Sequence, residues 1–182
     1  MGSMTTDLNN RYLQVPQYAS SYDFTAGNAP LMTVSGLRRT VEALTSSTKT
    51  LVAADSGKIF TLDRAAGITI TLPAAAAGYF FDFIVTTTFT GTWQIDAASS
   101  SDTLQGGCWI VDKDNVDSHV ATNAAATIGW STPAAADHQF VASADTLGRF
   151  LGSRLTYLAA SASIWVVSGV VFGDGTLALP FT

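Results

Sequence analysis

The chain has 182 residues with 9 basic and 14 acidic side chains, a formal net charge of −5 and a single cysteine. Apolar residues make up 47% of the chain and charged residues only 13%. A disordered chain needs low hydrophobicity and high charge, so we expect most of this one to fold as a single domain. One cysteine excludes an intramolecular disulfide framework and a zinc site built from several cysteines.

The composition also excludes two classes of partner. The chain is acidic and Arg38–Arg39 is its one basic pair, which argues against nucleic acid, because phosphate binding needs clustered cations. The apolar stretch 164–172 is far shorter than the roughly 20 residues of a membrane-spanning helix. The first thirty residues lack the basic start and the apolar run of a secretion signal, so we expect synthesis in a cytoplasm.

Residues 1–47 are predicted to form an N-terminal arm. Its first part contains four aromatic side chains without helical or alternating spacing. These are Tyr12, Tyr18, Tyr22 and Phe24. Aromatic side chains without a pattern favour extended docking onto another surface, and an unstructured terminus is the alternative.

The end of the arm is the one stretch suited to a short helix. Within Thr33–Thr45, Ser35 is a candidate N-cap. Leu37, Val41 and Leu44 follow at spacings of four and three residues, which is the spacing of one helix face. The sequence therefore predicts a helix at this place.

From about Thr48 the pattern changes to period two, which is typical of strands. Ile68–Leu72 alternates isoleucine or leucine with threonine, and it is predicted to form a hairpin with Lys58–Leu62 across a turn at Gly67. Further strands are expected at 79–87, 92–95, 108–111, 127–130, 138–142, 154–158 and 164–172. Many short strands at regular spacing predict an all-β fold, with a β-sandwich or jelly-roll-like body over residues 48–182.

The chain offers no credible active site. His119 and His138 are not at ligand spacing from a second donor, and no signature links either one to Cys108 as a nucleophile and base pair. A buried, inert thiol is the expected state of Cys108, which precedes Trp109 in a predicted strand. We therefore predict that the protein is not an enzyme and has no cofactor.

Two binding alternatives remain open at the level of sequence. Asp112, Asp114 and Asp117 could present oxygen ligands to calcium, but they lack the glycine and the terminal glutamate of an EF-hand, and a solvated loop is the simpler interpretation. Trp93 and Trp130 lie near turns, where partial exposure would allow stacking on sugars. Trp165 lies in a strongly apolar strand and is expected to be buried.

The run Leu51–Leu72, followed by Pro73–Gly78 and the aromatic stretch 79–85, resembles a segment of tailed-bacteriophage virion proteins. Gly152–Tyr157 and Trp165–Gly169 are similar to the closing strands of those proteins. The resemblance covers residues 48–172 and does not include the arm. It implies a small accessory protein of the virion, and capsid decoration or cement proteins are the nearest in size.

The resemblance and the composition together predict a non-enzymatic decoration protein on the capsid surface. Its expected partners are the major capsid protein and further copies of itself in a homotrimer, with no nucleic acid and no membrane. The predicted contact residues are Tyr12, Tyr18, Tyr22, Phe24, Arg38 and Arg39. The alternative is a tail-fibre, head-fibre or spike domain that recognises a host surface glycan through Trp93 or Trp130.

Overall fold

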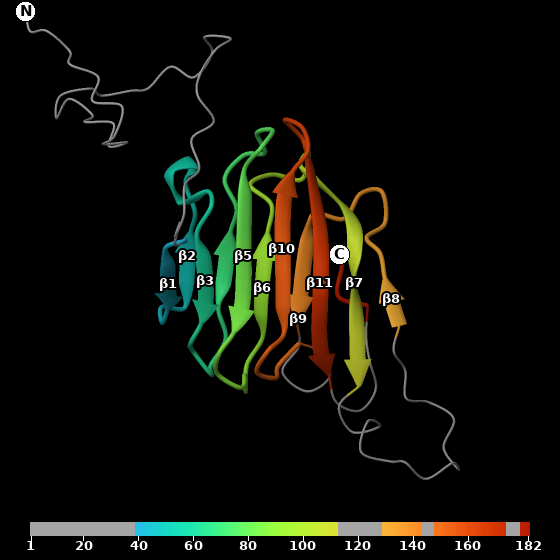
Figure 1. Ribbon diagram of the computed structural model, residues 1–182. Helices are drawn as coiled ribbons and strands as arrows, with labels where there is room; N and C mark the ends of the chain where they lie inside the picture. Colours follow the sequence, from blue (N-terminus) through green and yellow to red (C-terminus); the bar gives the residue numbers. More distant parts are fainter. Residues whose placement is uncertain (1–38, 113–128, 143–147, 174–178) are drawn as a thin grey trace, which may run out of the picture. The chain divides into compact units, whose positions relative to one another are not determined.

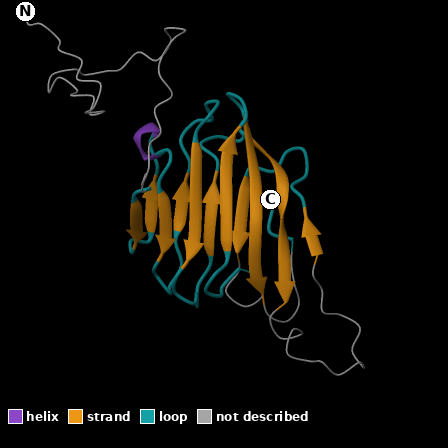
Figure 2. Cartoon of the chain, viewed as in Figure 1, coloured by secondary structure: helices purple, strands orange, loops and turns teal. Residues whose placement is uncertain are grey.

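The computed structural model describes residues 39–112, 129–142, 148–173 and 179–182. The chain divides into two units, Met1–Leu37 and Arg38–Thr182, and the second contains every described residue. This unit, called the body below, is almost entirely β structure (Figures 1 and 2). The prediction of an all-β, sandwich-like fold is confirmed.

The described part of the body has eleven strands and one short 3-10 helix. They are β1 Val41–Leu44, β2 Thr48–Thr50, η1 Ala53–Asp55, β3 Ile59–Leu62, β4 Thr69–Thr71, β5 Phe80–Val85, β6 Trp93–Asp96, β7 Thr103–Asp112, β8 Gly129–Ser131, β9 Gln139–Ala142, β10 Arg154–Ala159 and β11 Ile164–Gly173. A seven-stranded sheet has the order β1-β3-β5-β10-β11-β7-β8, and a four-stranded sheet has the order β2-β4-β6-β9. Figure 1 shows the two sheets as stacked layers.

The first six strands alternate between the two sheets, so that the chain winds as a flattened coil. β1, β3 and β5 pair in parallel in the larger sheet, and β2, β4 and β6 pair in parallel in the smaller one. Successive coils touch closely at one turn, where a Cβ placed on Gly67 would lie 2.1 Å from the carbonyl oxygen of Thr92. Gly67 also has φ +99°, which only glycine adopts without strain. This glycine is therefore required by both backbone conformation and space.

The predicted hairpin between 58–62 and 68–72 is wrong. Both segments are strands, but β3 belongs to the seven-stranded sheet and β4 to the four-stranded sheet. The turn at Gly67 carries the chain from one layer to the other. The alternation of apolar and threonine side chains is correct for β4, because one face of it meets the core and the other lies outside.

The predicted helix at the end of the arm is also wrong where the structure describes it. Val41–Leu44 forms β1, which pairs in parallel with Ile59–Leu62 of β3. The apolar residues that have the spacing of a helix face lie instead in a strand. Pairing with β3 stabilises the extended conformation more than the local sequence pattern favours a helix. Residues that the sequence assigned to the arm thus belong to the body, which begins at Arg38.

The last two strands, β10 and β11, complete the seven-stranded sheet. β10 lies antiparallel between β5 and β11, and β11 pairs in parallel with β7. The C-terminal residues 180–182 follow β9, where the amide of Val141 donates to the carbonyl of Pro180 at 2.7 Å and the amide of Thr182 donates to that of Gln139 at 3.1 Å. They cover part of the edge of the four-stranded sheet.

The core between the layers is rich in aromatic side chains. The ring centroids of Phe60 and Phe83 lie 5.6 Å apart, and those of Trp93 and Phe140 lie 5.0 Å apart. Trp165 and Tyr157 are fully buried, as expected for Trp165. Each such side chain removes a large apolar area from water, so these aromatics supply much of the stability of the sandwich.

Candidate functional site

The outer faces of the two sheets differ sharply in chemistry. The outer face of the four-stranded sheet consists almost entirely of polar side chains, as expected for a surface in contact with water. They are Thr48, Thr50, Thr69, Thr71, Gln94, Asp96 and Gln139, with Val141 as the one apolar member. Threonines face each other across β2 and β4 at Thr48–Thr69 and Thr50–Thr71.

The outer face of the seven-stranded sheet is mostly apolar, and we call it the apolar face. Its apolar members include Val41, Ile59, Phe80, Ile84, Leu158, Ile164, Val166, Val170, Phe172, Trp109 and Trp130, and among its polar members are Thr61, Gln105, Thr156 and Ser168. Val41 is 58% exposed and Leu158 is 43% exposed. Contiguous apolar surface of this kind marks an interaction site more often than a solvated surface.

One carboxylate lies at the middle of the apolar face. Asp82 of β5 is fully buried, although its side chain is on the outward side of its strand. It accepts hydrogen bonds from Arg39, from Arg154 at 2.9 Å, and from the hydroxyl of Thr156. Burial raises the pKa of Asp82, but these hydrogen bonds outweigh it and hold the pKa below its ordinary value. The carboxylate is therefore ionised in the folded protein.

Arg39 is the first described residue of the body, and its side chain forms hydrogen bonds to groups within the body. Besides Asp82, its guanidinium donates to the carbonyls of Gly57 at 2.7 Å and Lys58 at 3.0 Å, and it lies 4.6 Å from the ring centre of Phe80. The sequence predicts that Arg39 faces acidic groups of a partner. The structure instead gives it an internal acidic partner.

Arg154 has a different position. Its side chain is 53% exposed, and Nη2 donates to Asp82. On the strands of the apolar face in the described ranges, Asp82 and Arg154 are the outward charged residues, and Arg39 joins them from just before β1. Two guanidinium groups therefore share one carboxylate, which leaves one positive charge in excess on this face of an acidic chain.

Trp109 and Trp130 form an exposed aromatic pair at the β7–β8 end of the face. They are register partners, 46% and 48% exposed, with ring centroids 5.4 Å apart and planes at 69°. A Cβ placed on Gly107 would lie 3.1 Å from Cε2 of Trp130. The absence of a side chain at Gly107 thus leaves room for the Trp130 ring to lie against β7.

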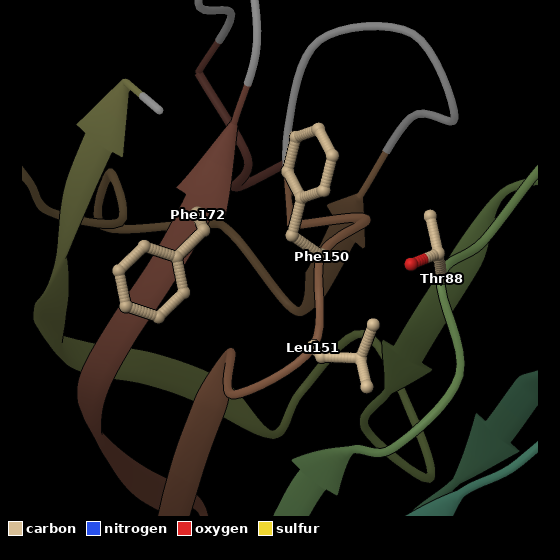
Figure 3. Close-up of a pocket in the computed structure, with 4 residues that line it drawn as sticks. All are labelled: Thr88, Phe150, Leu151 and Phe172. Atoms are coloured by element: carbon tan, nitrogen blue, oxygen red, sulfur yellow. The ribbon is translucent and has the colours of Figure 1, made fainter. Parts of the chain in front are cut away.

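An open apolar cavity of about 430 Å³ lies at the end of β11. It is lined by Thr88, Phe150, Leu151 and Phe172, which Figure 3 shows on three separate segments of the chain. Phe172 lies two residues beyond Val170 on the same side of β11. Among the described residues that line it there is one hydroxyl and no ionisable group, so the cavity suits an apolar side chain of a partner better than a reaction.

No catalytic arrangement occurs in the part of the chain that the structure describes. Cys108 is buried in β7, and burial raises the pKa of its thiol to about 12, which removes the reactive thiolate at neutral pH. Within the described ranges, no three His, Cys, Asp or Glu side chains gather where a metal could bind. His119, Asp114 and Asp117 lie outside those ranges. The same ranges contain no helix long and apolar enough to span a membrane.

Of the six predicted contact residues, only Arg39 is among the described residues. Tyr12, Tyr18, Tyr22, Phe24 and Arg38 lie outside the described residues. Partial exposure of Trp130 is confirmed, whereas partial exposure of Trp93 is wrong, because Trp93 is 1% exposed and its indole N–H donates to the carbonyl of Gly148.

Sequence reasoning missed Trp109, Arg154 and Asp82. The alternation within Gly107–Ile110 does place Trp109 opposite to Cys108, so strand periodicity could have found it. Nothing in the sequence joins Asp82 to Arg154, which lies 72 residues away. Comparison with protein families and with curated proteins finds no match for this chain.

Proposed function

We propose that this protein is a non-enzymatic structural protein of a tailed-bacteriophage virion, which decorates the capsid as a homotrimer and stabilises the lattice of the major capsid protein. The observation behind the proposal is the contrast between the two outer faces of the sandwich. One face is a layer of threonine and other polar side chains, and the other is an apolar sheet surface. A protein that acts by attachment needs such a surface and needs no reactive group.

The β1–β3–β5 end of the apolar face is the proposed attachment surface. Val41, Ile59, Phe80 and Ile84 lie there on the outward side of three neighbouring strands. Arg39, held by Asp82, is at the same place. The arm precedes Arg39 directly in the sequence.

The arm adds affinity through its aromatic residues in this proposal. Tyr12, Tyr18, Tyr22 and Phe24 have Gln, Ser, Asp and Pro residues as well as small or aliphatic ones between them, without a regular spacing, which suits a segment that becomes ordered when it binds. Such a segment can cross the boundary between neighbouring capsid subunits. Arg38 is the proposed contact to an acidic group of the lattice.

The test is cosedimentation of the protein with expanded, empty heads of the cognate phage. We expect saturable binding at a fixed ratio to capsid subunits, and mass photometry of the free protein should show trimers. Val41→Glu should weaken binding at least about tenfold, because it places a charge on the attachment surface. Thr50→Glu on the polar face is the matched control and should bind as the wild type does. Absence of binding by the wild type would contradict the proposal and favour the fibre or spike assignment.

A further inference from the structure

We propose that Trp109, Trp130 and Arg154 form a binding site for an acidic saccharide, in which sugar rings pack on the indoles and a carboxylate binds the guanidinium. The site extends from β10 to β8 of the apolar face and adjoins the attachment surface, because Arg154 is the register partner of Ile84. The inference goes beyond the proposed function, because it gives the body a ligand of its own. It does not depend on capsid binding.

The three side chains lie in one row across neighbouring strands. Trp130 of β8 pairs with Trp109 of β7, Trp109 with Val170 of β11, and Val170 with Arg154 of β10. Neighbouring strands are about 4.8 Å apart, so Arg154 is roughly 10 Å from Trp109 along the row. A short oligosaccharide laid along this row can reach the indoles and the guanidinium together.

The surface between them is shallow. Val170 is partly buried and lies between Trp109 and Arg154, while Gly107 and Ser168 form the adjoining row. Gly107 is buried beside the Trp130 ring, and Ser168 is exposed with a hydroxyl group. An extended ligand therefore meets the exposed indoles, the partly buried Val170 and the hydroxyl of Ser168.

The chemistry of the row indicates a sugar. An indole offers a broad apolar surface and one N–H donor, which matches the alternation of C–H and hydroxyl groups around a pyranose ring. Both indoles are about half exposed although they are large apolar groups, and each has the other as its ring partner. The two rings meet edge to face, with their planes at 69°, so they offer a sugar two differently oriented aromatic surfaces rather than an enclosed pocket.

The positive charge of Arg154 indicates that the ligand is acidic. Arg154 donates through Nη2 to Asp82, which holds the guanidinium in place and leaves its other edge towards solvent. A planar guanidinium binds a carboxylate through two parallel hydrogen bonds. Because Asp82 is shared with Arg39, it neutralises only one of the two cations, and an anionic ligand is attracted by the remaining charge.

The experiment titrates the full-length free protein with trigalacturonic acid and, separately, with its methyl ester, which keeps the rings and removes the charge. Tryptophan fluorescence and calorimetry report binding. We expect saturable binding of the acid and binding of the ester that is weaker by about tenfold or more. The ligand should also protect the indoles from iodide quenching, because Trp93 and Trp165 are buried and only the proposed site contains exposed tryptophans among the described residues.

Variants separate the two parts of the site. Arg154→Gln should weaken binding of the acid by about tenfold and leave the ester unchanged. Trp130→Ala should weaken both ligands, whereas Leu158→Ala, on the same face but outside the row, should change neither. Thermal unfolding checks that each variant is folded.

Three results would overturn the proposal. They are the absence of saturable binding of the acid at millimolar concentration, equal affinity for acid and ester, and unchanged affinity in Trp130→Ala and Arg154→Gln. If cosedimentation with heads is instead lost in Trp130→Ala, the row belongs to a protein interface. Because the titration contains no heads, its failure would not affect the proposed capsid function.

Discussion

The guanidinium of Arg154 donates a 2.9 Å hydrogen bond to the carboxylate of Asp82, and so joins two strands that are 72 residues apart in the sequence. Asp82 lies on β5, the last coil strand of the larger sheet, and Arg154 begins β10, which closes the sandwich. The same carboxylate accepts from Arg39 at the start of the body. One buried charge thus connects the beginning, the middle and the end of the fold.

Replacement of this carboxylate should cost stability in a pH-dependent way. Asp82→Asn should lower the free energy of unfolding at pH 7 by about 1.5–3 kcal/mol, the usual contribution of hydrogen bonds to a charged group. The pKa of Asp82 is lowered by folding, so its contribution is complete above the unfolded pKa of about 3.9 and is lost as the pH falls through the folded value. Urea unfolding between pH 3 and 7 measures the difference.

Asp63→Asn is the matched control, because Asp63 is exposed. It should change the free energy of unfolding by less than about 0.5 kcal/mol at pH 7. The difference in the free energy of unfolding between the wild type and Asp82→Asn should become smaller below about pH 4. A gap that stays constant from pH 7 to pH 3 would show that the loss comes from packing and not from ionisation.

A turn between strands can require glycine for two reasons, a positive φ or a lack of space for a Cβ. Gly57 and Gly67 allow the two effects to be measured apart. Both have positive φ, at +99° and +88°, but a Cβ on Gly57 meets nothing within 4 Å. Gly57→Ala should therefore cost only the backbone strain, about 1–2 kcal/mol. Gly67→Ala should cost a further 1–3 kcal/mol, roughly the cost of overpacking, because its Cβ meets the backbone of Thr92. Equal losses in chemical denaturation would contradict the close contact between coils.

Cys108 should be inert in the folded protein. It is fully buried and the pKa of its thiol is about 12, so the thiolate is scarce at pH 8. Ellman's reagent should therefore react with the native protein only at the rate of unfolding, and with the whole population in guanidinium chloride. Rapid and complete reaction under native conditions would show that β7 opens or that the thiol is accessible.

Glu42 and Lys49 should prevent association at the β1–β2 end of the sandwich. Glu42 of β1 forms ion pairs with Lys49 of β2 and, at 3.0 Å, with Lys58. Charges at the exposed edges of sheets oppose pairing between molecules. The double variant Glu42→Val/Lys49→Val should associate into species larger than the wild type in analytical ultracentrifugation.

This variant should barely change the free energy of unfolding, because ion pairs at the surface contribute only about 0–1 kcal/mol and both side chains remain about 30% exposed to solvent. Thr48→Val is the control, since it adds an apolar side chain on β2 without removing the charges. Association of the control to the same extent would mean that apolar content, rather than lost charge, causes the effect.

The sequence predicts the strands of the body well but not their partners. The expected strands from 58–62 to 164–172 all coincide with observed ones, because alternation reports which side chains meet the core. Alternation does not report which sheet a strand joins. β3 and β4 are neighbours in sequence but belong to different layers. The assumption that two strands joined by a short turn pair with each other was therefore wrong here.

The functional surfaces could be predicted only in part. Trp130 was expected to be exposed because it is near a turn, and the same argument failed for Trp93, whose ring packs against Phe89 and Phe140. The Asp82 cluster could not be predicted, because its three charged residues come from distant segments. Such clusters depend on strand order, which single-sequence patterns do not contain.

The strand order has a consequence for synthesis. Two strands near the centre of the larger sheet, β10 and β11, follow all the other strands in the sequence, and β5 stays without its β10 neighbour until they emerge. The ribosome therefore releases β1, β3 and β5 well before the seven-stranded sheet can be completed. Nascent chains that stop before Arg154 should therefore expose open strand edges and require protection by chaperones until β10 has been synthesised.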